Sequence, residues 1–121
     1  MKRYLLIILS CISFLHPNVI YRVPIDGTID LGLPPFIERA IEEAENNNAK
    51  AIIFDINTFG GRVDAATQIK DAILGSEILT IAFINRRAIS AGALISLSFL
   101  IMSYCRISRR KCQAKSYLIS H

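Results

Sequence analysis

Two short segments rich in small residues could together carry out acyl transfer. Residues 57–62 read Asn-Thr-Phe-Gly-Gly-Arg and follow an apolar run, and Ser90 comes 29 residues after Gly61. Glycine takes a positive φ freely and lets another backbone approach closely. The Gly60-Gly61 turn can therefore direct N–H groups at an oxygen that gains negative charge in a reaction. With Ser90 as the hydroxyl donor, the two segments predict an oxyanion hole and a nucleophile.

The residues after Ser90 add a second backbone donor. Ala91 and Gly92 are small enough for a helix to begin directly after the serine, and the first N–H groups of a helix have no partner within it. Each segment by itself also has an ordinary explanation, because Gly-Gly suits a strand-to-helix turn and serine commonly caps helices. Their joint occurrence at the ends of two strands favours a site, since ligand sites gather there in α/β sheets.

The elements that must position these residues follow from the hydrophobic pattern. Apolar runs predict strands at 20–25, 51–56 and 78–84, with a turn at 27–30. Three-four spacing predicts helices at 34–46 and 62–74, the second capped by Gly75, and a third helix from Ser90. Four glutamates of the first helix are expected on its solvated face: Glu38, Glu42, Glu43 and Glu45. This alternation predicts an α/β fold with a largely parallel sheet.

Three blocks of the sequence, in this order, resemble the NfeD-type membrane-bound serine proteases, relatives of signal peptide peptidase A and Clp protease. The blocks are Val-Pro-Ile-Asp-Gly-Thr-Ile-Asp at 23–30, Asp-Ile-Asn-Thr-Phe-Gly-Gly-Arg-Val-Asp-Ala-Ala at 55–66, and Ala-Ile-Ser-Ala-Gly-Ala at 88–93. The resemblance spans roughly residues 20–98. It implies a Clp/crotonase-like spiral of ββα units over residues 19–98, a partial protease domain that is incomplete at its C-terminus.

The resemblance also implies roles for individual residues. Ser90 matches the nucleophile of the family, and Gly60, Gly61 and the Ala91 amide fall where its oxyanion stabilisers lie. The expected substrate is a peptide or protein with a hydrophobic segment, and a stomatin-like membrane protein and self-association are expected partners. Phe59 stands where the family usually has proline. The family's general base is a lysine that lies further beyond the serine than this chain extends.

The two ends of the chain differ from its middle. Residues 1–18 combine Lys2 and Arg3 with an apolar run too short to span a bilayer, which predicts a signal peptide or short N-terminal anchor. The protease part would then be exported or membrane-associated, on the extracytoplasmic side. Residues 99–121 form a divergent basic tail with five Lys and Arg and no acidic residue, whereas the preceding residues carry nine basic and ten acidic groups. The formal net charge of +4 therefore belongs to the tail.

No other arrangement of residues competes strongly for this chemistry. Lys111 and Lys115 are expected to be solvated and protonated, so they do not replace the missing base. Asp55 continues a strand and His121 is terminal, so neither indicates a triad. The cysteines have no histidine at metal-ligand spacing, and we expect no metal, cofactor or nucleic acid.

Three functions remain open at this point. The first is a serine endopeptidase with a Ser-Lys mechanism, truncated before its lysine. The second is a catalytically inactive fragment or a peptide-binding assembly partner. The third is a crotonase-like acyl-CoA binder, for which the basic CoA-binding residues are missing. A lysine supplied by another chain would separate the first from the second.

Overall fold

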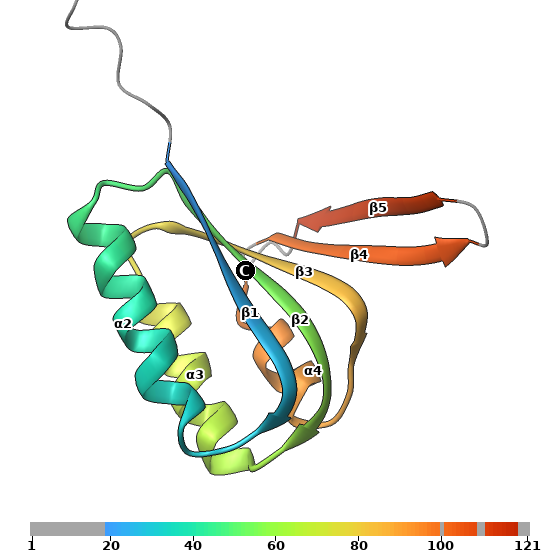
Figure 1. Ribbon diagram of the computed structural model, residues 1–121, viewed down its shortest axis with the longest axis horizontal. Helices are drawn as coiled ribbons and strands as arrows, with labels where there is room; N and C mark the ends of the chain where they lie inside the picture. The colour runs from blue at the N-terminus through green and yellow to red at the C-terminus, as the bar shows by residue number, and fades with distance from the viewer. Residues whose placement is uncertain (1–18, 100, 109–110, 119–121) are drawn as a thin grey trace, which may run out of the picture.

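A curved, largely parallel sheet carries the helices on its concave side (Figure 1). The computed structural model describes residues 19–99, 101–108 and 111–118. Its elements in chain order are β1 (Ile20–Ile29), α2 (Leu33–Asn46), β2 (Ala51–Gly61), α3 (Val63–Gly75), β3 (Leu79–Ala88), α4 (Ala91–Ser96), β4 (Ile101–Ser108) and β5 (Lys111–Leu118). The predicted α/β alternation is therefore confirmed through α4.

The strands follow one another across the sheet in the order β1-β2-β3-β4-β5. The first four are parallel, and β5 runs antiparallel to β4. Two of the pairings shift register near their carboxyl ends, between Asp26 and Thr28 in β1 and between Ile56 and Thr58 in β2. A bulge bends a strand and increases its twist. The two strands expected in each ββα unit are thus two parts of one long, bent strand.

Several predicted boundaries were wrong, two of them because of these register shifts. Residues 27–29 were expected in a turn but belong to β1, and residues 57–61 were expected in a turn but complete β2. Gly75 is the last residue of α3, and Ser76 follows it as the C-cap. Bulged strands tolerate glycine and polar residues, which read as turn signals in the sequence.

The core lies between the sheet and the helices. Alternate residues of the first three strands are buried, as expected of a sheet face that packs on helices: Val23, Ile25, Ile52, Phe54, Ile56, Ala82 and Ile84. They meet the apolar faces of α2 and α3, which include Ile37, Ile41, Ile69 and Ile73. Phe54 also packs against Phe99 with ring centroids 5.1 Å apart. Full burial of one such side chain stabilises the fold by about 1.5–3 kcal/mol.

Helix positions were predicted well at the centres of the helices and less well at their ends. Glu38, Glu42 and Glu43 are exposed, as expected. Phe36, Val63 and Leu74 were expected to face the core, but they are 39%, 62% and 57% exposed. Each lies within the first or last turn of its helix.

The last two strands form a hairpin that extends away from the helices (Figure 1). No element was expected there beyond residue 98. β4 joins the sheet through the pairs from Ile81↔Ile101 to Ile84↔Tyr104, and the hairpin closes from Ile101↔Leu118 to Ser108↔Lys111. The tail lysines, Lys111 and Lys115, belong to β5, but their side chains lie outside the described part of the structure, as does His121.

The predicted signal or anchor at residues 1–18 also lies outside the described residues. None of the helices in the part of the chain that the structure describes is both long and apolar enough to cross a membrane. The division into residues 1–18, 19–98 and 99–121 therefore stays a prediction.

Candidate active site

The ends of β2 and β3 bring the two predicted segments together. Thr58 pairs with Ala88, and the Ile89 N–H donates to the Thr58 carbonyl at 3.1 Å. Gly60 has φ +106°, and a Cβ added to it would lie 2.9 Å from the Ser90 Cβ and 3.2 Å from the Ala91 nitrogen. Gly60 therefore touches both Ser90 and Ala91, and only glycine fits between them.

Ser90 lies at the apex of a strained turn. Its φ of 55° and ψ of −119° correspond to the second position of a type II′ turn, which glycine usually fills. The turn is closed by the Gly92 N–H, which donates to the Ile89 carbonyl at 3.0 Å. Such a conformation costs about 1–3 kcal/mol in a non-glycine residue and persists where the surroundings hold it, often at functional sites.

The Ser90 side chain is exposed and does not cap the helix that follows. Although Ser90 occupies the N-cap position of α4, its hydroxyl makes no capping hydrogen bond. The ordinary explanation of a serine at a helix start is therefore not what the structure shows. A sharp strand-to-helix turn that exposes a serine hydroxyl is also how α/β-hydrolases present their nucleophile.

The three predicted backbone donors differ in their surroundings. The Ala91 N–H begins α4 and has no partner within that helix. Gly61 passes so close to β1 that an added Cβ would overlap the backbone of Ile29, 2.7 Å from its nitrogen. The Gly60 N–H already donates to the Thr58 hydroxyl, at 2.9 Å. The close approach needs both glycines, and of the three amides the Gly60 N–H is already bonded to Thr58.

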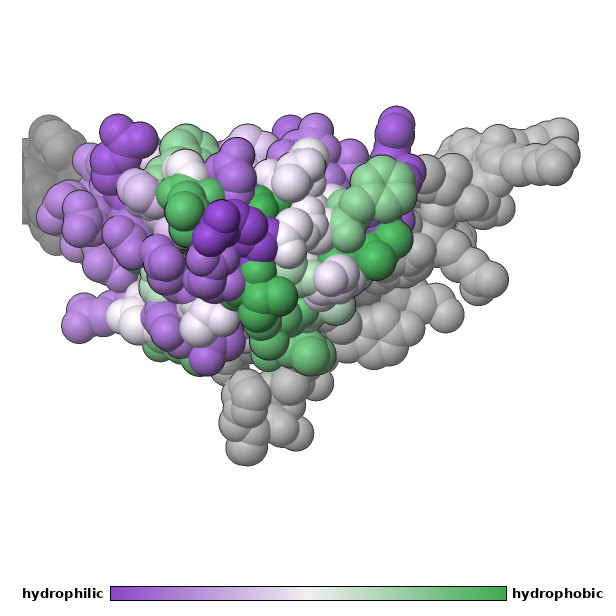
Figure 2. Space-filling model, turned by 90° about the horizontal axis from the view of Figure 1, so that it is seen from below, coloured by the Kyte–Doolittle hydropathy of each residue, from purple (hydrophilic) through white to green (hydrophobic). Residues whose placement is uncertain are grey.

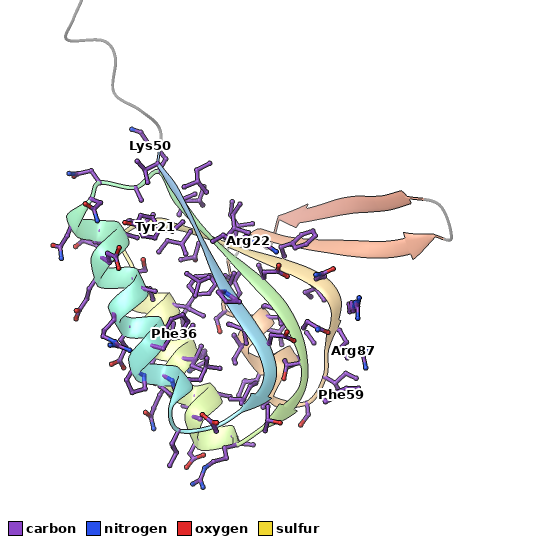
Figure 3. The ribbon with its side chains drawn as sticks, in the orientation of Figure 1. Tyr21, Arg22, Phe36, Lys50, Phe59 and Arg87 are labelled. Atoms are coloured by element: carbon purple, nitrogen blue, oxygen red, sulfur yellow. The ribbon has the colours of Figure 1, made fainter. Side chains whose placement is uncertain are left out.

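Apolar surface surrounds this end of the sheet (Figure 2). Several large apolar residues at or just beyond the strand ends are 49–69% exposed: Leu31, Phe59, Val63 and Ile89. The Arg87 guanidinium lies 4.2 Å from the centroid of the Phe59 ring, and Figure 3 shows the two residues on neighbouring strand ends. Such cation–π contacts contribute about 0.5–1 kcal/mol at exposed sites.

One ion pair follows directly after Gly60 and Gly61. Arg62 donates from Nε and Nη2 to the Asp64 carboxylate, at 3.0 and 2.7 Å. The hydrogen bonds from Arg62, with a further one from the Ala65 N–H, lower the pKa of Asp64 to about 2. Both side chains are exposed, so the pair contributes little to stability.

No charged side chain that the structure describes forms a hydrogen bond or ion pair with Ser90. Lys50 precedes β2 at the opposite end of the strands (Figure 3), and Lys70 on α3 is paired with Asp71 at 2.9 Å. Asp55 is buried on β2 and forms an ion pair with Arg22. Among the described residues, no three His, Cys, Asp or Glu side chains lie close enough to share a metal ion.

Sequence reasoning missed two residues of this region. Thr58 was read only as part of a turn, although a threonine directly before the glycines is a sequence signal for a buried hydroxyl that binds nearby backbone groups. Arg87 carried no signal, because its contact with Phe59 joins two strands that are distant in sequence.

Comparison with known proteins identifies relatives of the chain. Residues 19–103 match the family model described as NfeD1b, N-terminal domain. The membrane protein NfeD1b of Bacillus subtilis (strain 168) is 42% identical over 80 residues, which are 66% of this chain and 18% of that protein. The membrane-bound protease PH1510 of Pyrococcus horikoshii is 36% identical over 104 residues, 80% of this chain and 24% of that protein. The chain therefore spans about a quarter or less of the length of these curated relatives.

Solved structures give the same result. The 1510-N membrane protease from Pyrococcus horikoshii, described as specific for a stomatin homologue, superposes with a TM-score of 0.68 at 34% identity, covering 74% of this chain and 46% of that one. A mutant of that protease in complex with a substrate peptide also gives 0.68, at 33% identity, over 74% of this chain and 42% of that one.

A more distant structure shows the fold alone. ClpP1 from Listeria monocytogenes superposes with a TM-score of 0.55 at 23% identity, over 69% of this chain and 54% of that one. The predicted Clp-like α/β fold is thus confirmed. Because the family model covers most of the chain and the superposed proteases share its fold, the chain belongs to the family of the NfeD1b N-terminal domain.

Proposed function

We propose that this chain carries the nucleophile side of a serine endopeptidase site. Ser90 attacks the carbonyl carbon of a peptide bond, and the Gly61 and Ala91 N–H groups stabilise the oxyanion that forms. Gly60 contributes by its lack of a side chain, which lets the two strands meet. The observation that carries the proposal is the exposed Ser90 hydroxyl in a strained turn against Gly60, without a capping bond.

The proposed reaction needs a general base from outside the described core. A serine hydroxyl is a weak nucleophile until a base takes its proton. The base gives that proton to the leaving amine as the peptide bond breaks, and water then hydrolyses the ester formed on Ser90. Lys50 lies at the opposite end of the strands (Figure 3), and the Lys70 ammonium is paired with Asp71. The base is then a lysine of a longer or second chain. Self-association of the chain would offer one route to such a residue.

The substrate proposed is a peptide or protein with a hydrophobic segment. The exposed apolar residues around the strand ends, including Phe59, Val63 and Ile89, would pack against its side chains. Because a relative is a protease specific for a stomatin homologue, a stomatin-like membrane protein is the proposed partner. The relatives are named as membrane proteins, which supports membrane association. Export, with the protease part on the extracytoplasmic side, rests on the signal predicted at residues 1–18.

A second candidate function is peptide binding without cleavage. It is favoured by one observation: among the described residues, no lysine or histidine side chain forms a hydrogen bond with Ser90. In that case the exposed apolar residues at the strand ends would bind a hydrophobic peptide, and Ser90 would not react with it.

Labelling with a serine-directed fluorophosphonate separates the two functions. We expect the folded chain to be labelled, the Ser90→Ala variant to lose the label, and the Ser76→Ala variant to keep it. Ser76 is a suitable control because its hydroxyl already bonds to Glu45 at 3.2 Å. A folded protein that takes no label, yet binds an apolar peptide in fluorescence anisotropy, would contradict the protease and support the binding function.

A further inference from the structure

Thr58 makes more contacts around the proposed site than any role in a simple turn requires. It is 1% exposed, and it lies between the register shift of β2 and Gly60. Its hydroxyl donates to the carbonyl of Gly27 in β1 and accepts the N–H of Gly60 at 2.9 Å. A hydroxyl has one proton, so the longer 3.5 Å contact with the Gly60 carbonyl is not a second donated bond.

The rest of Thr58 holds both sides of the Ser90 turn. Its carbonyl accepts the N–H of Ile89, the residue before the serine, at 3.1 Å. Its methyl group fills the space beside Gly92, two residues after the serine, where an added Cβ would overlap the Thr58 Cγ2. One buried residue therefore contacts β1, the glycine turn, the end of β3 and the start of α4.

We propose that Thr58 is a positioning residue, which sets the Ser90 hydroxyl relative to the Gly61 and Ala91 amides. The inference rests on the proposed function of Ser90. Thr58 does not touch substrate; it acts through Gly60, whose N–H it binds, and through Gly92, against which its methyl packs. The bond to Gly60 fixes the peptide before that glycine. Glycine has few steric limits of its own on φ and ψ, so this bond and the strand pairing, rather than a side chain, hold Gly60 at φ +106° and with it the direction of the following Gly61 N–H.

The hydroxyl and the methyl group have separable tasks. Valine has nearly the shape of threonine and suits a strand equally well, but it offers no hydroxyl. Serine keeps the hydroxyl and loses the methyl. If Thr58 served only to fill the core, valine would replace it fully. If it positions the amides, serine is the better replacement, since valine leaves the Gly60 N–H without its partner.

Two readouts test the proposal on the full chain with Thr58→Val and Thr58→Ser. The first is the rate of Ser90 labelling by a fluorophosphonate as a function of pH. Small misplacements of reacting groups can cost about 10²-fold in rate. We therefore expect the labelling rate of Thr58→Val to be lower than that of the parent chain by about tenfold or more at every pH. Thr58→Ser should stay closer to the parent chain than Thr58→Val does.

The second readout does not depend on activity. Amide hydrogen exchange of Gly60, followed by ¹⁵N NMR, should accelerate in Thr58→Val because its hydrogen bond is lost, and remain protected in Thr58→Ser. If the parent chain takes no label, the proposed function fails, and the exchange of Gly60 still decides whether Thr58 fixes this turn. Equal labelling and equal Gly60 protection in Thr58→Val and the parent would overturn the inference.

Discussion

The ends of β1 and β2 both bulge and both contain a glycine with positive φ, but the two glycines have different neighbours. Each strand shifts register and then contains a glycine with positive φ, Gly27 at +79° and Gly60 at +106°. A Cβ on Gly27 would have no atom within 4 Å, whereas a Cβ on Gly60 would lie 2.8 Å from the Ile89 oxygen and 2.9 Å from the Ser90 Cβ. Gly27 is needed for its conformation alone, and Gly60 also for the approach of another chain segment.

The polar groups around the two bulges differ in the same way. In β1 the Asp26 carboxylate accepts the Gly27 N–H at 3.0 Å and the Asn57 side-chain amide at 2.8 Å. These bonds brace the bend within the sheet. In β2 the Gly60 N–H bonds to Thr58, and the glycine faces the serine turn. A bulge therefore becomes a candidate site only where a second element is packed against it.

The largest effect is expected from Gly60→Ala. The new methyl group adds the strain of a positive φ to an overlap with the backbone of the Ser90 turn. Together these should lower the free energy of unfolding by about 2–6 kcal/mol. Because the chain has no tryptophan, urea unfolding is best followed by far-UV circular dichroism. Labelling of Ser90 should also be lost in whatever fraction folds, and a variant with parent-like stability would contradict the close approach.

Gly27→Ala should have a smaller effect on the same measurement. The position is open, so only the positive φ penalises alanine, by about 1–2 kcal/mol. Gly27→Asn should cost less than alanine, because asparagine tolerates this conformation through local hydrogen bonds. Labelling of Ser90 should be unchanged in both variants. A loss of labelling without unfolding would show that the two bulges are coupled more tightly than the comparison implies.

Phe59→Ala should affect binding more than stability. The ring is 69% exposed, so its removal should change the free energy of unfolding by no more than about 0.5 kcal/mol. Loss of the cation–π contact with Arg87 adds about 0.5–1 kcal/mol to this change. An apolar peptide labelled with a fluorophore should bind the Ser90→Ala, Phe59→Ala double variant more weakly than Ser90→Ala alone. Phe36→Ala is the matched control, since Phe36 is an exposed phenylalanine on α2. Equal weakening of peptide binding by both substitutions would show that the exposed apolar residues at the strand ends are not part of the proposed site.

The smallest effect on stability is expected from the Arg62–Asp64 ion pair, which follows Gly61 at the end of β2. Asp64 has a folded-state pKa of about 2, below the value of about 3.9 for an unfolded aspartate. Its contribution to stability is therefore present above pH 4 and is lost as the pH falls through the folded pKa. Asp64→Asn should flatten the acid limb of a stability–pH curve slightly. A steeper acid limb in the variant would contradict this assignment.

Several features of the fold were predictable because they depend on local pattern. The alternation of apolar runs with three-four spacing located three strands and two helices, and Ile37, Ile41 and Ile69 are buried as their spacing predicted. The extents of β1 and β2 were not predictable in the same way. Glycine and asparagine are turn residues by propensity, and only the pairing of Ile29 with Gly61 across the sheet extends the strands through them.

The candidate site was also predictable only in part from the sequence. Residue types and order predicted Ser90 with Ala91, and Gly60 with Gly61, as candidate site residues because the two segments occur together at the ends of successive strands. The sequence could not show that Gly60 touches Ser90, that Ser90 adopts a strained turn, or that the Thr58 hydroxyl takes up the Gly60 N–H. The approach of Gly60 to Ser90 joins the ends of two different strands, so it exists only once parallel pairing has aligned β2 and β3. The Ser90 turn and the Thr58–Gly60 bond are local in sequence, but the Ile89–Thr58 bond ties both to that same junction.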